Sequence, residues 1–323
     1  MKTACKVFGP FLVVALAIAS GPSSAQGYPS KPTRFVTGNQ PGGGTDTLAR
    51  SIGPKLAERL GQQVLVENRP GADGVIATEY VAKSAPDGYT LLLGADGQMV
   101  LNLGLHAKLP YDPVKDFAPI TRISFTPLVL AVHPSLPVTS IAELIALAKA
   151  RPGELFYASG APSFHVTTEL FKKQAGVNIV HVRYKGAAPA QTAAVAGEVA
   201  VIMSSLGPLR AHLQSGKLRG LAITSPVRNA VIPDIPTMAE SGLADFDVVP
   251  WIGLFAPAGT PREIIDKLSS EVISVLNLKE LKERFAAGGV TLSGTTPAEL
   301  GALQQADIAK WMSIMNDLHI RAQ

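Results

Sequence analysis

The segment 40–46, Gln-Pro-Gly-Gly-Gly-Thr-Asp, holds residue types that suit the binding of an anion. Its successive glycines leave backbone N–H groups uncovered, and they lie between an extended run at 34–37 and a helix-patterned run at 47–60. Free N–H groups and the positive end of a helix dipole favour a carboxylate or a phosphate. A tight turn in which Thr45 or Asp46 caps the helix explains the same residues without a ligand. The segment lacks a P-loop lysine and dinucleotide-type glycine spacing, which disfavours a nucleotide.

Two later loops carry hydroxyls, open backbone and a cation between a strand-like and a helix-like run. The first spans 158–163 and the second 184–190. Such loops suit the binding of a small acid. A helix N-cap at Ser163 and a structural turn at Gly186 would explain the same residues without a ligand. The residues of interest are Ser159, Gly160, Ser163, Tyr184, Lys185 and Gly186.

The catalytic motifs that we sought are absent from the sequence. It has no His-Glu-x-x-His pair, no Gly-x-Ser-x-Gly elbow and no Ser-x-x-Lys set, and its histidines do not follow metal-ligand spacing. His165 starts the helix behind loop 158–163 and could line a cleft or face solvent, whereas His106 and His181 read as surface, strand or turn positions. An exported hydrolase with Ser163 as nucleophile and His165 as base is an alternative. The two side chains diverge at a helix start, which disfavours it. We expect no cofactor and no metal.

The first 25 residues are typical of an export signal. Lys2 and Lys6 precede an apolar run at 11–19, and Ser23-Ser24-Ala25 is a small-residue cleavage site. The run is shorter than the roughly 20 apolar residues of a membrane span. We therefore predict cleavage after Ala25 and a periplasmic protein.

Removing this signal changes the composition of the chain. Cys5 is the only cysteine, so the mature protein has neither a disulfide nor a Cys metal site. The formal net charge falls from +4 to +2 when Lys2 and Lys6 leave. Because the basic residues are scattered, we expect no nucleic-acid partner.

Strand-like and helix-like runs alternate along the chain, which predicts an α/β fold with two lobes, each a mostly parallel sheet flanked by helices, and a cleft between them. The mature chain of about 300 residues is longer than a single hydrophobic core usually supports, which also favours two lobes. With extended crossings near 123–126 and 247–254, the expected division is 1–25 signal peptide, 26–125 first lobe, 126–246 second lobe and 247–323 return to the first lobe. Pro54 lies inside the first helix pattern, where we expect a kink.

Several motifs in order resemble one family over essentially the whole mature chain. They are Tyr28–Pro32, Pro41–Asp46, Val66–Ala72, Ala85–Leu91, Leu109–Pro113, Lys115–Phe117 and Phe255–Pro261. In these motifs the chain is similar to the Bug family of bacterial extracytoplasmic solute receptors, the substrate-binding components associated with tripartite tricarboxylate transporters. The resemblance implies a type II periplasmic-binding-protein fold, a cleft for a small carboxylated solute and no catalysis.

The resemblance also implies ligand contacts at particular positions. They are Gly43, Gly44 and Thr45 in the first loop, Ser159, Gly160 and Ser163 in the second, and Tyr184 and Gly186 in the third. Gln40 departs from the family pattern and places an amide at the cleft mouth, and Asp46 and His165 are further candidates. Ser204 stands where many relatives have an acidic residue, which argues against an amino-acid ligand.

The sequence thus predicts a monomeric periplasmic receptor that closes on a carboxylated solute. We expect it to present the closed form to membrane components of a tripartite tricarboxylate transporter or to a sensing partner. A third possibility, the effector domain of a transcription regulator, shares the fold class but conflicts with the export signal and the missing helix-turn-helix.

Overall fold

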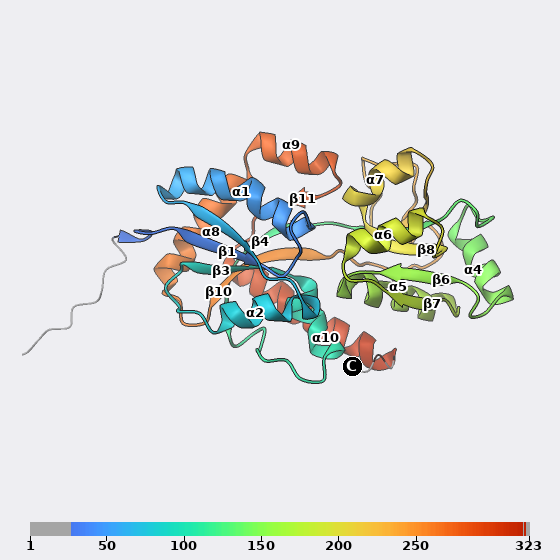
Figure 1. Ribbon diagram of the computed structural model, residues 1–323, viewed down its shortest axis with the longest axis horizontal. Coiled ribbons are helices and arrows are strands. Elements are labelled where there is room, and N and C mark those ends of the chain that lie inside the picture. Colours follow the sequence, from blue (N-terminus) through green and yellow to red (C-terminus); the bar gives the residue numbers. More distant parts are fainter. Residues whose placement is uncertain (1–26, 319, 321–323) are drawn as a thin grey trace, which may run out of the picture.

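The computed structural model describes residues 27–318 and 320. The predicted signal peptide and its cleavage site after Ala25 lie outside the described residues. Two sheets flanked by helices stand side by side along the long axis of the molecule and form two lobes (Figure 1). The predicted α/β two-lobed fold is confirmed. Within the described part of the chain, none of the helices combines the length and the apolar character that a membrane crossing requires.

The first lobe is built on a six-stranded sheet with the order β11-β4-β10-β3-β1-β2. Helices α1 and α9 lie above this sheet in Figure 1, and α2 and α10 lie below it. The strands are β1 (Thr33–Thr37), β2 (Val64–Asn68), β3 (Thr90–Ala95), β4 (Phe117–Phe125), β10 (Trp251–Pro257) and β11 (Thr291–Leu292). The helices are α1 (Gly44–Leu60), η2 (Ala72–Gly74), α2 (Val75–Ala82), η3 (Gly97–Leu101), α3 (Asn102–Leu105), α8 (Arg262–Leu276), α9 (Lys279–Ala287) and α10 (Pro297–Asp317).

The second lobe is built on a five-stranded sheet with the order β7-β6-β8-β5-β9. Its strands are β5 (Leu128–Val132), β6 (Phe156–Ser159), β7 (Val180–Arg183), β8 (Val201–Ser205) and β9 (Arg219–Ile223). Its helices are α4 (Ile141–Ala150), α5 (Pro162–Ala175), α6 (Ala187–Val195) and α7 (Leu206–Gln214). Helix α7 and strand β9 have no counterpart in the sequence prediction.

Local sequence signals account for most helix boundaries. Ser140 accepts a hydrogen bond from the Glu143 N–H and starts α4, and Thr296 and Glu299 form a capping box at α10. The apolar residues of helix α8 recur at helical spacing, and the stripe that they form is buried. Pro54 lies inside α1, which continues to Leu60, and the kink expected there stays a prediction.

The sheets are mixed, so the expectation of mostly parallel sheets was wrong. Strand β1 pairs in parallel with β2 and β3, but β10 pairs antiparallel with β3 and β4. In the other sheet β6 is parallel to β7 and β8, and β5 is antiparallel to β8 and β9. The antiparallel strands β4, β5, β9 and β10 are those that lead into or out of the connections between the lobes. An apolar run does not encode strand direction, which here follows from the path of the chain across the molecule.

The two connections between the sheets run beside each other. The Thr126 N–H donates to the Pro250 carbonyl at 2.9 Å, and the Thr224 N–H donates to the Leu128 carbonyl at 2.9 Å. The proposed division of the chain at 125 and 246 stays a prediction.

Candidate functional site

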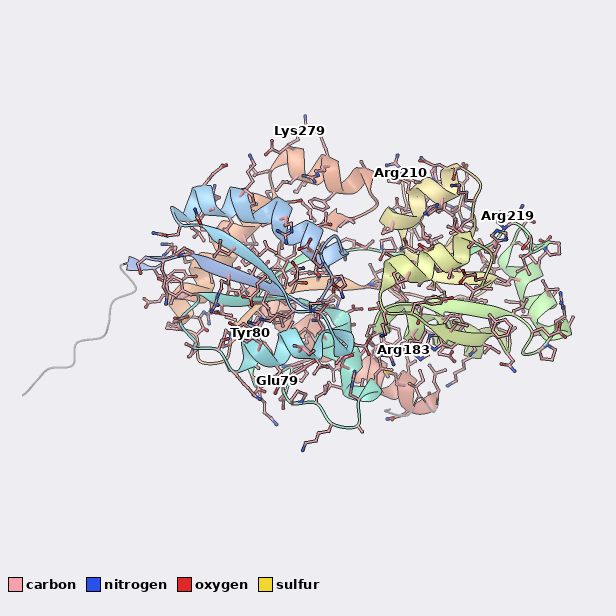
Figure 2. The ribbon with its side chains drawn as sticks, viewed as in Figure 1. Glu79, Tyr80, Arg183, Arg210, Arg219 and Lys279 are labelled. Atoms are coloured by element: carbon pink, nitrogen blue, oxygen red, sulfur yellow. The ribbon has the colours of Figure 1, made fainter. Side chains whose placement is uncertain are left out.

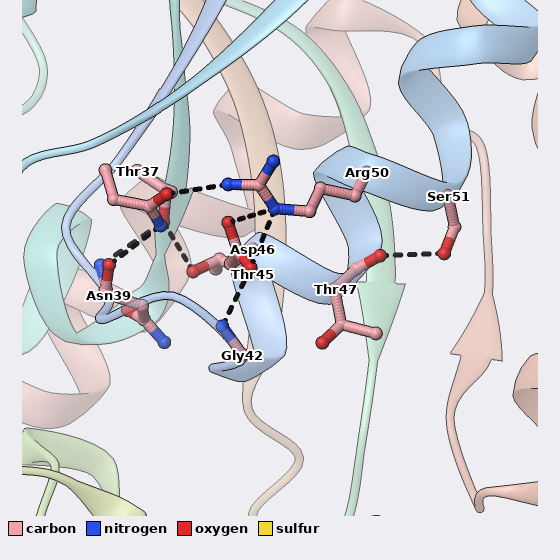
Figure 3. A network of polar contacts seen from close by, with 9 residues as sticks. Thr37, Asn39, Gly42, Thr45, Asp46, Thr47, Arg50 and Ser51 are labelled. Carbon is pink, nitrogen blue, oxygen red and sulfur yellow. Dashed lines mark hydrogen bonds and ion pairs between the residues drawn. The ribbon is translucent and has the colours of Figure 1, made fainter.

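The first predicted loop lies at the N-terminus of α1, where Asp46 organises it (Figure 3). Asp46 is buried, and its carboxylate accepts hydrogen bonds from the Gly42 N–H at 2.8 Å and from Arg50 Nε at 2.9 Å. Burial by itself would raise the pKa of Asp46, but these two hydrogen bonds lower it below the usual value. Asp46 is therefore already engaged in holding the loop.

The groups left for a ligand in this loop are backbone amides. The Gly43 N–H donates to the Gln40 carbonyl at 2.9 Å, and Thr45 Oγ1 lies 2.5 Å from Thr37 Oγ1. The N–H groups of Gly44 and Thr45 are at the first turn of α1, where a helix supplies no backbone acceptor. This is the arrangement that favours an anion at a helix N-terminus.

The two loops of the second lobe are in direct contact. The Tyr184 N–H donates to the Ser159 carbonyl at 2.9 Å. A Cβ atom on Gly160 would overlap the carbonyl of Gly186 and would lie 2.7 Å from Ala187 N, so only glycine fits between the loops. The predicted residues of these loops therefore form one continuous wall.

A cavity of about 260 Å³ lies between the lobes beside this wall. Four of the predicted residues line it, namely Ser159, Gly160, His165 and Tyr184. The other lining residues include Asp73 and His106 from the first lobe and His181 and Arg183 from the second. No local motif distinguishes these last four residues, because their proximity arises only when the lobes meet.

The predicted residues Gln40, Gly43, Gly44, Thr45, Asp46, Ser163, Gly186 and Ser204 do not line this cavity. Ser204 is buried and accepts a hydrogen bond from Gln191 Nε2 at 3.0 Å. Gly38, which precedes the loop 40–46, packs closely against Gly74, the chain neighbour of the cavity residue Asp73, since a Cβ on Gly38 would lie 2.7 Å from Gly74 Cα.

Among the polar contacts that join the lobes, one is between two cavity residues and another is buried outside the cavity lining. Arg183 Nη2 lies 2.6 Å from Asp73 Oδ2 at the junction seen in Figure 2. Ser163 Oγ donates to Asp96 Oδ1 at 2.7 Å, and burial raises the pKa of Asp96 to about 7. Because its hydrogen is directed to Asp96, the Ser163 hydroxyl cannot donate to a solute at the same time. The predicted contact of Ser163 with a ligand thus stays a proposal, whereas its contact with the other lobe is present.

Aromatic rings form a stack at the floor of the cavity. The rings of His165 and His181 lie 4.2 Å apart with an 18° interplanar angle, and Tyr157 stacks 4.8 Å from His181. Ser159 Oγ lies 2.6 Å from His181 Nε2. Burial lowers the pKa of His181 to about 4, with a further contribution from His165, and burial also lowers the pKa of His165. In the described residues, no group of three or more His, Cys, Asp or Glu side chains is placed to hold a metal ion.

The hydrolase alternative with Ser163 as nucleophile and His165 as base is not supported, because both side chains bond to other partners. Ser163 Oγ is bonded to Asp96, and His165 Nδ1 lies 2.7 Å from Tyr157 Oη. A Ser–His mechanism requires the two side chains to be bonded to each other.

Comparison with known proteins agrees with the fold. Residues 48–320 match the family described as the tripartite tricarboxylate transporter family receptor. The chain is 38% identical to protein BugT of Bordetella pertussis over 309 residues, which cover 95% of each chain. The structure of R. palustris Rpa4515 with adipate superposes with a TM-score of 0.87 at 36% identity, over 92% of this chain and 100% of that one. MatC from Rhodopseudomonas palustris with bound malate superposes with a TM-score of 0.83 at 32% identity, over 89% and 99%.

Two lobes, a cavity between them and matches over nearly the full length of these proteins lead to one assignment. The chain belongs to the tripartite tricarboxylate transporter receptor family, the Bug-type solute-binding receptors, and is a receptor rather than an enzyme.

Proposed function

We propose that this protein is a periplasmic receptor that captures a small carboxylated solute in the cleft between its lobes. The observation that carries the proposal is that each lobe offers a loop suited to an acid: N–H groups without a helical acceptor at the start of α1 on one lobe, and the joined loops around Ser159 and Gly186 on the other. The adipate and malate in the two similar structures support a carboxylated ligand.

Closure of the lobes would couple solute binding to recognition by a partner. A solute that contacts both walls stabilises the closed arrangement more than the open one and so shifts the population toward it. The contacts of Ser163 with Asp96 and of Arg183 with Asp73 would form only in the closed arrangement. The partner we propose is the membrane part of a tripartite tricarboxylate transporter, or a sensing protein.

A thermal-shift series with mono-, di- and tricarboxylates and amino acids tests the ligand class. A ligand that binds only the folded state adds about 2.7 kcal/mol of stability at a hundredfold excess over Kd, which is a shift of several degrees for a protein of this size. We expect carboxylic acids to produce this shift. Substitution Gly43→Val should remove it, since a branched side chain there meets Asn39 Cβ and the Gln40 carbonyl at 3.0 Å and distorts the loop.

Gly27→Val is the matched control for that variant. Nothing lies within 4 Å of a Cβ atom at Gly27, so its melting temperature and its response to acids should equal those of the wild type. The proposal fails when no carboxylic acid raises the melting temperature, or when Gly43→Val responds like the wild type.

Export is tested by the N-terminus of the protein recovered from the periplasm. Cleavage after Ala25 predicts a chain that begins at Gln26 and has no cysteine. N-terminal sequencing and a free-thiol assay measure both properties. A cytoplasmic pool that retains Met1 and Cys5 would contradict the proposed location.

A further inference from the structure

The cavity between the lobes holds one histidine in a defined tautomer. Tyr157 Oη lies 2.7 Å from Glu169 Oε1 and 2.7 Å from His165 Nδ1. Lys172 Nζ contacts both oxygens of Glu169, at 2.7 and 2.9 Å, which favours the ionised carboxylate. An ionised carboxylate only accepts, so the single hydroxyl hydrogen of Tyr157 is donated to Glu169. His165 Nδ1 must then carry the hydrogen that is donated to Tyr157 Oη.

These hydrogen bonds leave Nε2 of His165 without a hydrogen, so that it can act only as an acceptor. Burial lowers the pKa of His165, and Lys172 and Arg183 lower it further, while Glu169 and Asp73 act in the opposite direction. The stacked ring of His181 lies on one face of the imidazole. A neutral imidazole with its hydrogen on Nδ1 has a lone pair on Nε2. His165 lines the cavity, so Nε2 is the acceptor that this side chain can offer there.

The charges around the cavity already have partners. Arg183 is paired with Asp73, and Lys172 with Glu169. His106 Nε2 stands 3.6 Å from the same Asp73 carboxylate. A carboxylate entering the cavity would have to compete with Asp73 for Arg183, whereas a neutral group that donates a hydrogen bond could use His165 Nε2 without breaking an ion pair.

We propose that this cavity is a side chamber of the solute site in which His165 Nε2 accepts a hydrogen bond from a hydroxyl group of the bound acid. The preferred ligands are then hydroxy-substituted carboxylic acids. Ser159, Gly160 and Tyr184 belong both to the loops proposed to bind the carboxylate and to the lining of this chamber. One small molecule can therefore contact these loops with its carboxylate and His165 with its hydroxyl group. The chamber has a volume of about 260 Å³, whereas one water occupies roughly 30 Å³ in the liquid, so the chamber has room for part of a small organic acid. This inference rests on the proposed function and adds the substituent that the receptor selects.

Matched acid pairs test the preference in the purified wild-type protein. Calorimetric titration would compare succinate with malate, glutarate with 2-hydroxyglutarate and propionate with lactate. One added hydrogen bond should make the hydroxy acid bind about three- to tenfold tighter in the pairs that bind. Equal affinities within every pair would overturn the inference and leave the proposed function intact. Failure of all six acids to bind would overturn both. A preference for aspartate over malate would overturn the assignment of a hydroxyl.

Two variants connect the preference to His165. His165→Phe retains a stacking ring but has no acceptor, so the ratio of affinities within a pair should fall to about one. His133→Phe is the matched control, because His133 hydrogen-bonds Ser135 away from the chamber and its replacement should leave the ratio unchanged. An unchanged ratio in His165→Phe would overturn the inference.

The tautomer itself can be observed without any ligand. Nitrogen-15 NMR of histidine-labelled protein should show His165 protonated at Nδ1 and not at Nε2, and Tyr157→Phe should shift the ring toward the other tautomer. A wild-type His165 that carries its hydrogen on Nε2 would overturn the inference even if the variants fold poorly.

Discussion

Substitution of Gly160 by alanine is expected to lower solute affinity more than a hundredfold and to lower the melting temperature by several degrees. An added Cβ would overlap the carbonyl of Gly186 and lie 2.7 Å from Ala187 N, and both neighbours are backbone. Backbone cannot rotate away as a side chain can, so the loops after β6 and β7 must separate. Overpacking of this kind lowers the free energy of unfolding by about 1–3 kcal/mol. We expect a value near the upper end of this range because the neighbouring atoms belong to the backbone. The continuous wall that the loops form would be lost with it.

Gly301→Ala is the control for this experiment. The same added methyl group would meet Pro119 Cγ at 3.5 Å, an ordinary contact, inside helix α10. Alanine is favoured over glycine in a helix by about 1 kcal/mol, so this variant should melt at or above the wild-type temperature and bind normally. Melting curves and calorimetric titration with the best acid measure both properties. Wild-type affinity in Gly160→Ala would show that solute binding does not depend on the contact between the loops.

Asp96→Asn is expected to change the pH dependence of stability. Burial raises the pKa of Asp96 from 3.8 to about 7 in the folded protein, and Asp307 contributes to the rise. Between these pH values the folded state retains a proton that the unfolded state has lost, so the stability of the wild type falls as the pH rises and levels off above about 7. At about 1.4 kcal/mol per pH unit, the loss is at most about 4 kcal/mol.

The asparagine variant cannot lose this proton, so its stability should not carry this component. It should match the wild type near pH 4 and exceed it at pH 8. Urea unfolding midpoints of both proteins from pH 4 to pH 8 measure the difference. Asp266→Asn, at a half-exposed carboxylate on α8, should follow the wild-type profile and serves as control. Parallel profiles for wild type and Asp96→Asn would contradict the buried, protonated state of Asp96.

Local chemistry determined much of the secondary structure. The spacing of apolar residues in 262–276 predicts α8 with its observed bounds, because helix periodicity depends only on near neighbours. The order of strand, glycine-rich loop and helix likewise predicted where the site loops lie, since the loop follows a strand and leads into a helix N-terminus. Ser159, Gly160, His165 and Tyr184 could therefore be found without a structure.

Contacts between distant segments decided the rest. The sequence by itself determined the two-lobed α/β class and pointed to the loops proposed to carry the solute site, since these follow from periodicity and from short motifs. The antiparallel pairing of β10 depends on how the chain returns between lobes, which no local pattern encodes. Asp96 accepts a hydrogen bond from Ser163, which lies 67 residues later in the chain. Asp73 pairs with Arg183, which lies 110 residues later. Only the tertiary structure shows that Ser163 bonds to the opposite lobe and that His165 Nδ1 lies beside Tyr157 Oη, because each property depends on a partner brought near by folding.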